Sequence, residues 1–230
     1  MMDDWDIMKV ILPTIEDTSM TFIASGKTSN NKVFAFCDSL SKEYEVNRGT
    51  GEEKLVRINP HTKKYFELGW LNTVILLAST RIMGFDQISK DIANDLKGNE
   101  SIRQISNHYA RRLHRWHNIE GKQFDFQLIV SGYKNNLEIF YFDSSVDKQS
   151  HKVPYVVGGF KCESSPLFKE LYNKDVPSEN ELIDCAKTAF DITCKAHEEY
   201  VGGDRVIIEI AKEGIKLFHI LPDTGRIIRI

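Results

Sequence analysis

The chain has 230 residues, of which 41% are hydrophobic and 27% are charged, and it contains only 6 prolines. This composition is typical of one globular domain and excludes disordered, collagen-like and disulfide-knot classes. With 30 Lys and Arg against 33 Asp and Glu, the net charge of −3 favours neither nucleic acid nor anionic lipid as a partner.

The four cysteines are far apart in the sequence and form no C-x-x-C pair, a pattern typical of reduced cysteines in an intracellular protein. The first six residues, Met-Met-Asp-Asp-Trp-Asp, are acidic where a signal peptide would be basic. No apolar run approaches the roughly 18 residues of a membrane span. We therefore expect a cytoplasmic protein without a membrane partner.

The N-terminal quarter predicts a leader followed by strands. Residues 1–20 are too short for a domain and are interpreted as a leader or propeptide-like segment. Two apolar runs at 21–24 and 33–37, separated by turn-forming residues, predict a hairpin. Residues 54–58 and 64–69, on either side of an Asn-Pro-His turn, predict a second hairpin.

Helical spacing follows in the middle of the chain. Apolar positions from about 70 to 96 repeat at helical intervals and predict a helix with a break near Gly84. After Gly98, a stripe from Ile102 to Trp116 predicts a second helix. These two helices are expected to pack as an antiparallel pair.

Strands and helices alternate once more in the C-terminal half. Residues 124–130 and 137–142 predict a third hairpin, and 155–159 predict a further strand. Helices are expected at 167–172 and after Ser178, where Glu181 completes a capping box. A last hairpin is expected at 206–210 and 215–220. This order excludes a Rossmann sheet and a parallel barrel and predicts an α+β fold in a single domain, residues 21–230.

Strands enclosed by two helix pairs describe a four-layer αββα sandwich, and at this level the chain resembles a proteasome-type β subunit of the N-terminal nucleophile hydrolases. The resemblance covers about residues 20–220. Asp38 and Lys54 are 54 − 38 = 16 residues apart, as in that family. The segments that carry the resemblance are 21–24, 33–39, 53–58, 131–133, 157–159 and 201–210.

The resemblance implies a threonine peptidase. Thr21, made N-terminal by self-cleavage, would be nucleophile and base through its hydroxyl and its α-amine. Lys54 would supply positive charge, Asp38 would hold that lysine, and the backbone N–H at or near Gly69 would stabilise the oxyanion. The family's later aspartate falls on Glu198.

The resemblance also implies what this chain would bind. No cofactor and no metal are expected. The expected partners are protein or peptide substrates, further copies of the chain in a homo-oligomeric ring and, in addition, an ATP-dependent unfoldase.

The sequence leaves open whether the chain is an active peptidase or a catalytically inactive member of the same fold. Met20 stands where the family has glycine before the nucleophile, and Met20 itself aligns with the nucleophile if the register moves by one residue. In that register no hydroxyl is present at the nucleophile position. The chain would then be a catalytically inactive member of the same fold, with residues 1–20 retained and a structural or binding role. The intact mass of the purified chain distinguishes the two.

Three further motifs favour ordinary structural roles. Residues 24–28 match the end of a phosphate-binding loop. The motif also requires a glycine at position 21, where the chain has Thr21, and a following helix, where the sequence predicts a hairpin. The basic cluster at 111–117 is interpreted as a solvated helix face rather than a nucleic-acid site. His114 and His117 lack a carboxylate or cysteine at metal-ligand spacing and are interpreted as surface residues.

Overall fold

The computed structural model describes residues 14–17, 21–46, 53–79, 85–119, 125–159, 165–198, 201–220 and 226–229. These residues form an α+β protein with two large antiparallel sheets, a smaller three-stranded sheet and four α-helices. The predicted α+β class is confirmed. The leader boundary at residue 20 lies in a stretch outside the described residues.

The first large sheet has five strands in the order β10-β9-β8-β7-β6, all antiparallel. Its strands are β6 (Tyr65–Leu68), β7 (Thr73–Ser79), β8 (Phe126–Tyr133), β9 (Leu137–Asp143) and β10 (His151–Val153). Helices α2 (Phe85–Asn94) and α3 (Ile102–Ile119) pack on one face of it through a cluster that includes Ile105, Tyr109 and Phe126.

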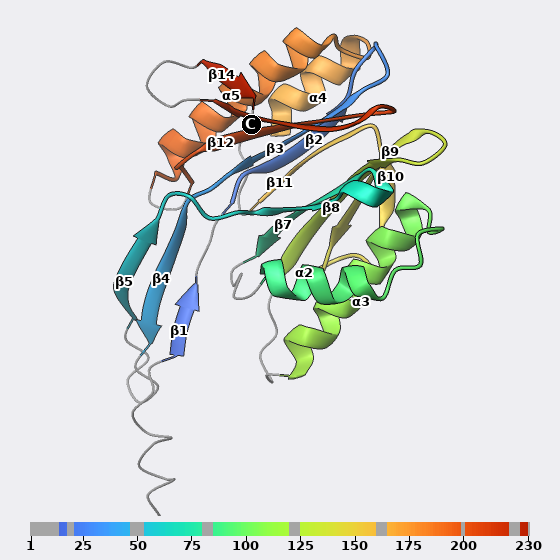
Figure 1. The fold of residues 1–230 in the computed structure, drawn as a ribbon. Helices are drawn as coiled ribbons and strands as arrows, with labels where there is room; N and C mark the ends of the chain where they lie inside the picture. Colours follow the sequence, from blue (N-terminus) through green and yellow to red (C-terminus); the bar gives the residue numbers. More distant parts are fainter. Residues whose placement is uncertain are drawn as a thin grey trace, which may run out of the picture.

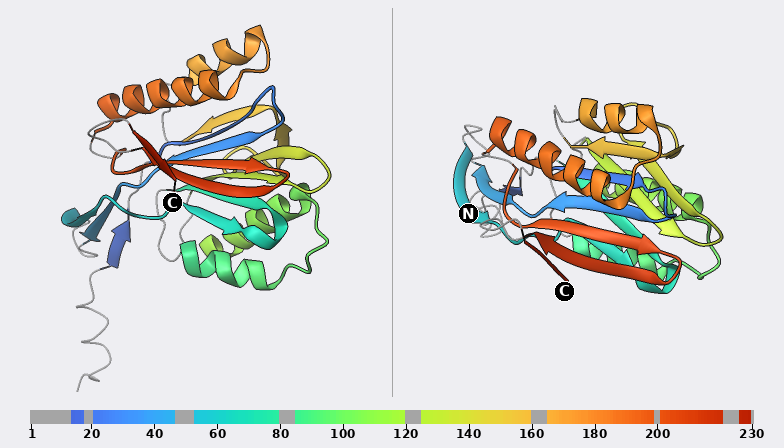
Figure 2. Two further views of the ribbon diagram at one scale, coloured as in Figure 1. Left: turned by 45° about the horizontal axis from the view of Figure 1, so that its top comes forward. Right: turned by 90° about the horizontal axis from the view of Figure 1, so that it is seen from above.

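The second large sheet has six strands in the order β11-β2-β3-β12-β13-β14. Its strands are β2 (Ile23–Lys27), β3 (Val33–Asp38), β11 (Tyr155–Gly158), β12 (Arg205–Ala211), β13 (Gly214–Ile220) and β14 (Ile227–Arg229). Helices α4 (Ser165–Lys174) and α5 (Glu179–Ala196) cover one face through Phe168, Leu182 and Phe190. Figure 2 shows the two helix pairs on opposite sides of the strands.

A third apolar cluster joins the two large sheets. It combines residues of the six-stranded sheet, such as Ile23 and Ile208, with residues of the five-stranded sheet, such as Leu76 and Ile129. Buried Ser25 and Ser131 also exchange a hydrogen bond of 2.8 Å between these sheets. Buried side chains of the two sheets are therefore in contact with one another.

The small sheet has the order β1-β4-β5 and stands to one side of the larger sheets (Figure 1). Its strands are β1 (Thr14–Asp17), β4 (Ser41–Val46) and β5 (Glu53–Asn59). β5 pairs with β4, and β6 pairs with β7. The predicted hairpin of 54–58 with 64–69 is therefore wrong in its pairing, although both segments are strands.

The predicted helix from residue 70 is also wrong over its first part. A short 3₁₀ turn (η1, Gly69–Leu71) is followed by β7, in which every residue is buried. A strand covered on both faces has no alternation, so Val74, Leu77 and Ala78 match helical spacing by coincidence. The later helices are confirmed, and Ser178 and Glu181 form the predicted capping box of α5.

Candidate functional site

A buried ion pair lies at the end of β3. The Nζ atom of Lys64 is 2.9 Å from Oδ2 of Asp38, and both side chains are fully buried. Asp38 is the last residue of β3, and Lys64 directly precedes β6, so the pair joins the two large sheets. Because a buried charge is costly without a partner, each of these two groups depends on the other.

Backbone N–H groups from three other segments also donate to the carboxylate of Asp38. Phe22 donates to Oδ1 at 2.9 Å, while Leu40 and Gly202 donate to Oδ2, each at 3.3 Å. Burial raises the pKa of Asp38, whereas the ammonium of Lys64 and the N–H donors act in the opposite direction. Asp38 thus fixes the positions of the chain before β2, the turn after β3 and the loop before β12.

Thr21 is the chain neighbour of a residue that Asp38 binds. It precedes Phe22, whose N–H is bound by Asp38, and only 2% of Thr21 is exposed. Gly159 packs against its carbonyl: a Cβ atom added to Gly159 would lie 1.9 Å from the oxygen of Thr21. Gly159 also has a φ of +118°, which side-chain-bearing residues rarely adopt. Only glycine fits at this contact.

A side-chain amide holds Gly159 in place. Oε1 of Gln127 accepts the N–H of Gly159 at 2.7 Å, and Nε2 of Gln127 donates to Asp143 at 3.0 Å. Tyr141 donates its hydroxyl to the same carboxylate oxygen at 3.2 Å. The two bonds of Gln127 orient its amide, so the five-stranded sheet determines where Gly159 meets Thr21.

The structure corrects the predicted partner of Asp38 from Lys54 to Lys64. Lys54 is exposed on β5, where it is opposite Glu45 of β4. The spacing from Asp38 to the buried lysine is 64 − 38 = 26 residues rather than 16. The paired strands β4 and β5 lie between Asp38 and Lys64 in the sequence, which accounts for the larger spacing.

Gly69 and Glu198 are also separated from the pair. Lys64 and Gly69 flank opposite ends of β6, so about 16 Å of extended chain lies between them. Glu198 is exposed in the turn after α5. Within the described ranges its carboxylate bonds neither member of the pair, and the loop that follows reaches Asp38 through Gly202.

Of the predicted site residues, Thr21 and Asp38 are therefore brought together. Sequence reasoning missed Lys64, Gly202 and Gln127. The one sequence feature that could have indicated Lys64 is its position between the Asn-Pro-His turn and the apolar start of β6. Nothing in the sequence pattern distinguishes it from the adjacent Lys63, which is exposed.

Comparison with protein-family models and with curated proteins finds no match to this chain.

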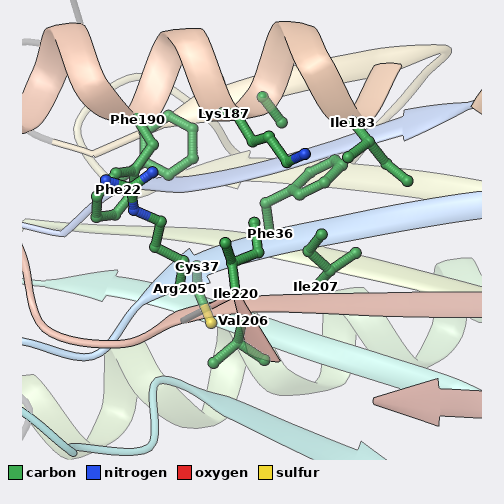
Figure 3. Close-up of a pocket in the computed structure, with 11 residues that line it drawn as sticks. Phe22, Phe36, Cys37, Ile183, Lys187, Phe190, Arg205, Val206, Ile207 and Ile220 are labelled. Atoms are coloured by element: carbon green, nitrogen blue, oxygen red, sulfur yellow. The ribbon is translucent and has the colours of Figure 1, made fainter. Parts of the chain in front are cut away.

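The small apolar cavity beside the site is too small for a substrate. It adjoins Phe22, Cys37 and Phe190, and Figure 3 shows these side chains beneath α5. Arg205 closes one side, with its guanidinium 4.3 Å from the ring centre of Phe190 and 2.7 Å from Asp191. A volume of about 10 Å³ accommodates no more than one water molecule.

No group of three or more His, Cys, Asp or Glu side chains is arranged to hold a metal ion in the described part of the chain. In the same part, no helix combines the length and apolar character needed to cross a bilayer. His117, one of the two histidines considered above, lies in a stretch whose side chains are outside this description.

Proposed function

We propose that this chain is a proteasome-like subunit of the N-terminal nucleophile hydrolase type, acting as a threonine endopeptidase in intracellular protein degradation. The observation that carries the proposal is the buried Asp38–Lys64 pair, whose carboxylate also binds the N–H of the residue after Thr21. The chemistry needs a cationic group near the threonine hydroxyl, and Lys64 is the candidate because Asp38 links it to the residue after Thr21.

The packing of the core supports a four-layer αββα sandwich. Apolar clusters lie between each helix pair and its sheet, and another lies between the two large sheets. In such an arrangement the outer surfaces of the helices are available for contacts with other subunits.

In the proposed maturation, the hydroxyl of Thr21 attacks the carbonyl carbon of Met20. The C–N bond between the two residues breaks, the amine of Thr21 takes a proton, and an ester forms. Water hydrolyses this ester, which releases residues 1–20 and leaves a free α-amine with an unperturbed pKa of about 7.7 to 8.0.

In the proposed turnover, that α-amine accepts the proton of the Thr21 hydroxyl as the hydroxyl attacks a peptide carbonyl. The ammonium of Lys64 stabilises the developing negative charge, and Asp38 keeps the ammonium in position. In this role Lys64 replaces Lys54. A protein or peptide substrate is consistent with a reaction that needs no cofactor and no metal.

Apolar side chains on the small sheet support assembly with further copies. Leu55, Val56 and Ile58 of β5 are 43%, 52% and 53% exposed, and Trp70 of η1, outside the small sheet, is 57% exposed. Exposed apolar residues gathered on one strand are typical of protein contacts. We propose a homo-oligomeric ring in the cytoplasm, served by an ATP-dependent unfoldase. Light scattering that showed only a 26.5 kDa monomer would contradict the proposed ring.

The second candidate function is a catalytically inactive subunit of the same fold with a structural or binding role. One observation favours it: β1, which precedes Thr21, pairs with β4 over four residues. A segment that forms part of a sheet is a structural element, and its release would leave β4 as an edge strand.

Hydrolysis of fluorogenic peptides by the purified protein tests the first candidate against the second. We expect turnover by the wild type, none by Thr21→Ala, and partial turnover by Thr21→Ser because the hydroxyl remains. Equal hydrolysis by the wild type and Thr21→Ala would assign the activity to a contaminant or another residue. No hydrolysis by the wild type would favour the inactive subunit.

A further inference from the structure

A surface hollow of about 300 Å³ lies between α3 and the connection from β9 to β10. Its volume is at the lower end of the range for small-molecule sites. It lies on the outer side of the five-stranded sheet, whereas Asp38 and Lys64 join the two sheets. The residues that line it are Gln104, Asn107, Ala110, Arg111, His114, Phe142, Lys148 and Gln149.

The lining is rich in hydrogen-bond donors and has no acid among the described residues. It contains the cations Arg111 and Lys148, three side-chain amides and one imidazole. Arg111 comes from the helix and Lys148 from the connection, so positive charge flanks the hollow from two elements. Within the described ranges, neither cation forms an ion pair with a carboxylate.

The structure also orients several of these donors. The Nε–H of Arg111 donates to the carbonyl oxygen of Asn107 at 3.2 Å, which leaves the two terminal nitrogens of the guanidinium for a ligand. The side-chain oxygen of Asn107 accepts the N–H of Ser150 at 3.0 Å, so its amide nitrogen remains as a donor. Edge contacts with Phe126 and Phe142 hold the ring of His114.

The nearest carboxylates in the sequence are engaged elsewhere. Asp143 accepts bonds from Gln127 and Tyr141 at one oxygen and from Ser145 at the other. Asp147 accepts the N–H of Asp143 at one oxygen and contacts His151 through the other. Within the described ranges, neither of these two acids forms an ion pair with Arg111 or Lys148.

We propose that this hollow binds a small organic anion through its phosphate or carboxylate group. Arg111 and Lys148 contact the oxygens, since guanidinium and ammonium groups form strong charge-assisted bonds to both kinds of oxyanion. The amides of Asn107 and Gln149 contact the remaining polar atoms, and the rings of His114 and Phe142 form the floor. This site is separate from Thr21 and does not depend on peptidase activity.

Calorimetric titration of the full-length chain tests this site, with inorganic phosphate and succinate as separate probes at fixed ionic strength. We expect saturable binding of at least one probe with a dissociation constant of about 1 mM or lower. Arg111→Gln and Lys148→Gln should each weaken it about tenfold, because each removes one charge-assisted contact. Stronger binding of phosphate would indicate a phosphate ester, and stronger binding of succinate would indicate a carboxylate.

Arg112→Gln is the matched control. It removes the same charge from the same helix, but Arg112 lies 3.1 Å from Asp95 and does not line the hollow. We expect less than a twofold change in affinity. The proposal is overturned if neither probe binds saturably, or if Arg112→Gln weakens binding as much as Arg111→Gln does.

Discussion

The Nζ atom of Lys64 lies 2.9 Å from Oδ2 of Asp38, and neither side chain is exposed to solvent. The same carboxylate accepts N–H groups from Phe22, Leu40 and Gly202. One carboxyl group thus organises the start of β2, the end of β3 and the loop before β12. Its position determines where the chain around Thr21 lies.

Lys64→Ala should strongly destabilise the fold, because it leaves the carboxylate of Asp38 buried without its ammonium partner. Breaking a buried pair typically costs about 3–5 kcal/mol. Urea denaturation followed by circular dichroism measures this loss as a lower midpoint.

Lys54→Ala is the matched control for that variant, since Lys54 is an exposed lysine. A surface substitution of this kind usually changes the free energy of unfolding by no more than about 0.5 kcal/mol. Equal midpoints for the two variants would show that Lys64 is not the buried partner of Asp38.

Gly159→Ala should lower the free energy of unfolding by more than about 2 kcal/mol. The added methyl group meets the carbonyl oxygen of Thr21, and the residue must also keep a φ of +118°. Gly214→Ala separates these causes, because Gly214 has a φ of +133° but no atom within 4 Å of the added Cβ. We expect it to cost only the conformational part, about 1–3 kcal/mol. Thermal unfolding that gave the same loss for both would argue against the close contact.

The capping box of α5 should make stability depend on pH. Hydrogen bonds from Ser178 lower the pKa of Glu181 below its ordinary 4.5. The ionised group is therefore favoured in the folded state, so its contribution is complete above pH 4.5 and is lost as the pH falls through the lower folded pKa. The melting-temperature difference between the wild type and Glu181→Gln should shrink over that window. A difference that grew on acidification would have the wrong sign for this cap.

Local signals in the sequence were sufficient for several elements. The apolar runs of β2 and β3, the stripe of α3 and the capping residues of α5 depend only on neighbours in the chain. β7 was missed because a strand buried on both faces shows no alternation, and its residues also satisfy helical spacing. β4 was missed because Ser41–Val46 is polar and its strand character depends on pairing with β1 and β5.

The candidate site was predictable only in part, because most of its contacts join segments that are far apart in the sequence. Asp38 ends an apolar strand and could be recognised, whereas Lys64 reaches it across a strand pair whose length no motif specifies. The contact of Gly159 with Thr21 joins residues 138 positions apart, by the arithmetic 159 − 21. Such contacts follow from how the sheets pack, which periodicity along the chain does not encode.

Intact-mass spectrometry of the purified wild type beside Thr21→Ala tests the central claim most directly. If Thr21 is the nucleophile of its own maturation, the wild type loses residues 1–20 and begins at Thr21, while Thr21→Ala keeps its full length. Full-length wild type and full-length Thr21→Ala together would contradict the claim and assign the chain to the inactive alternative with its N-terminal strand retained.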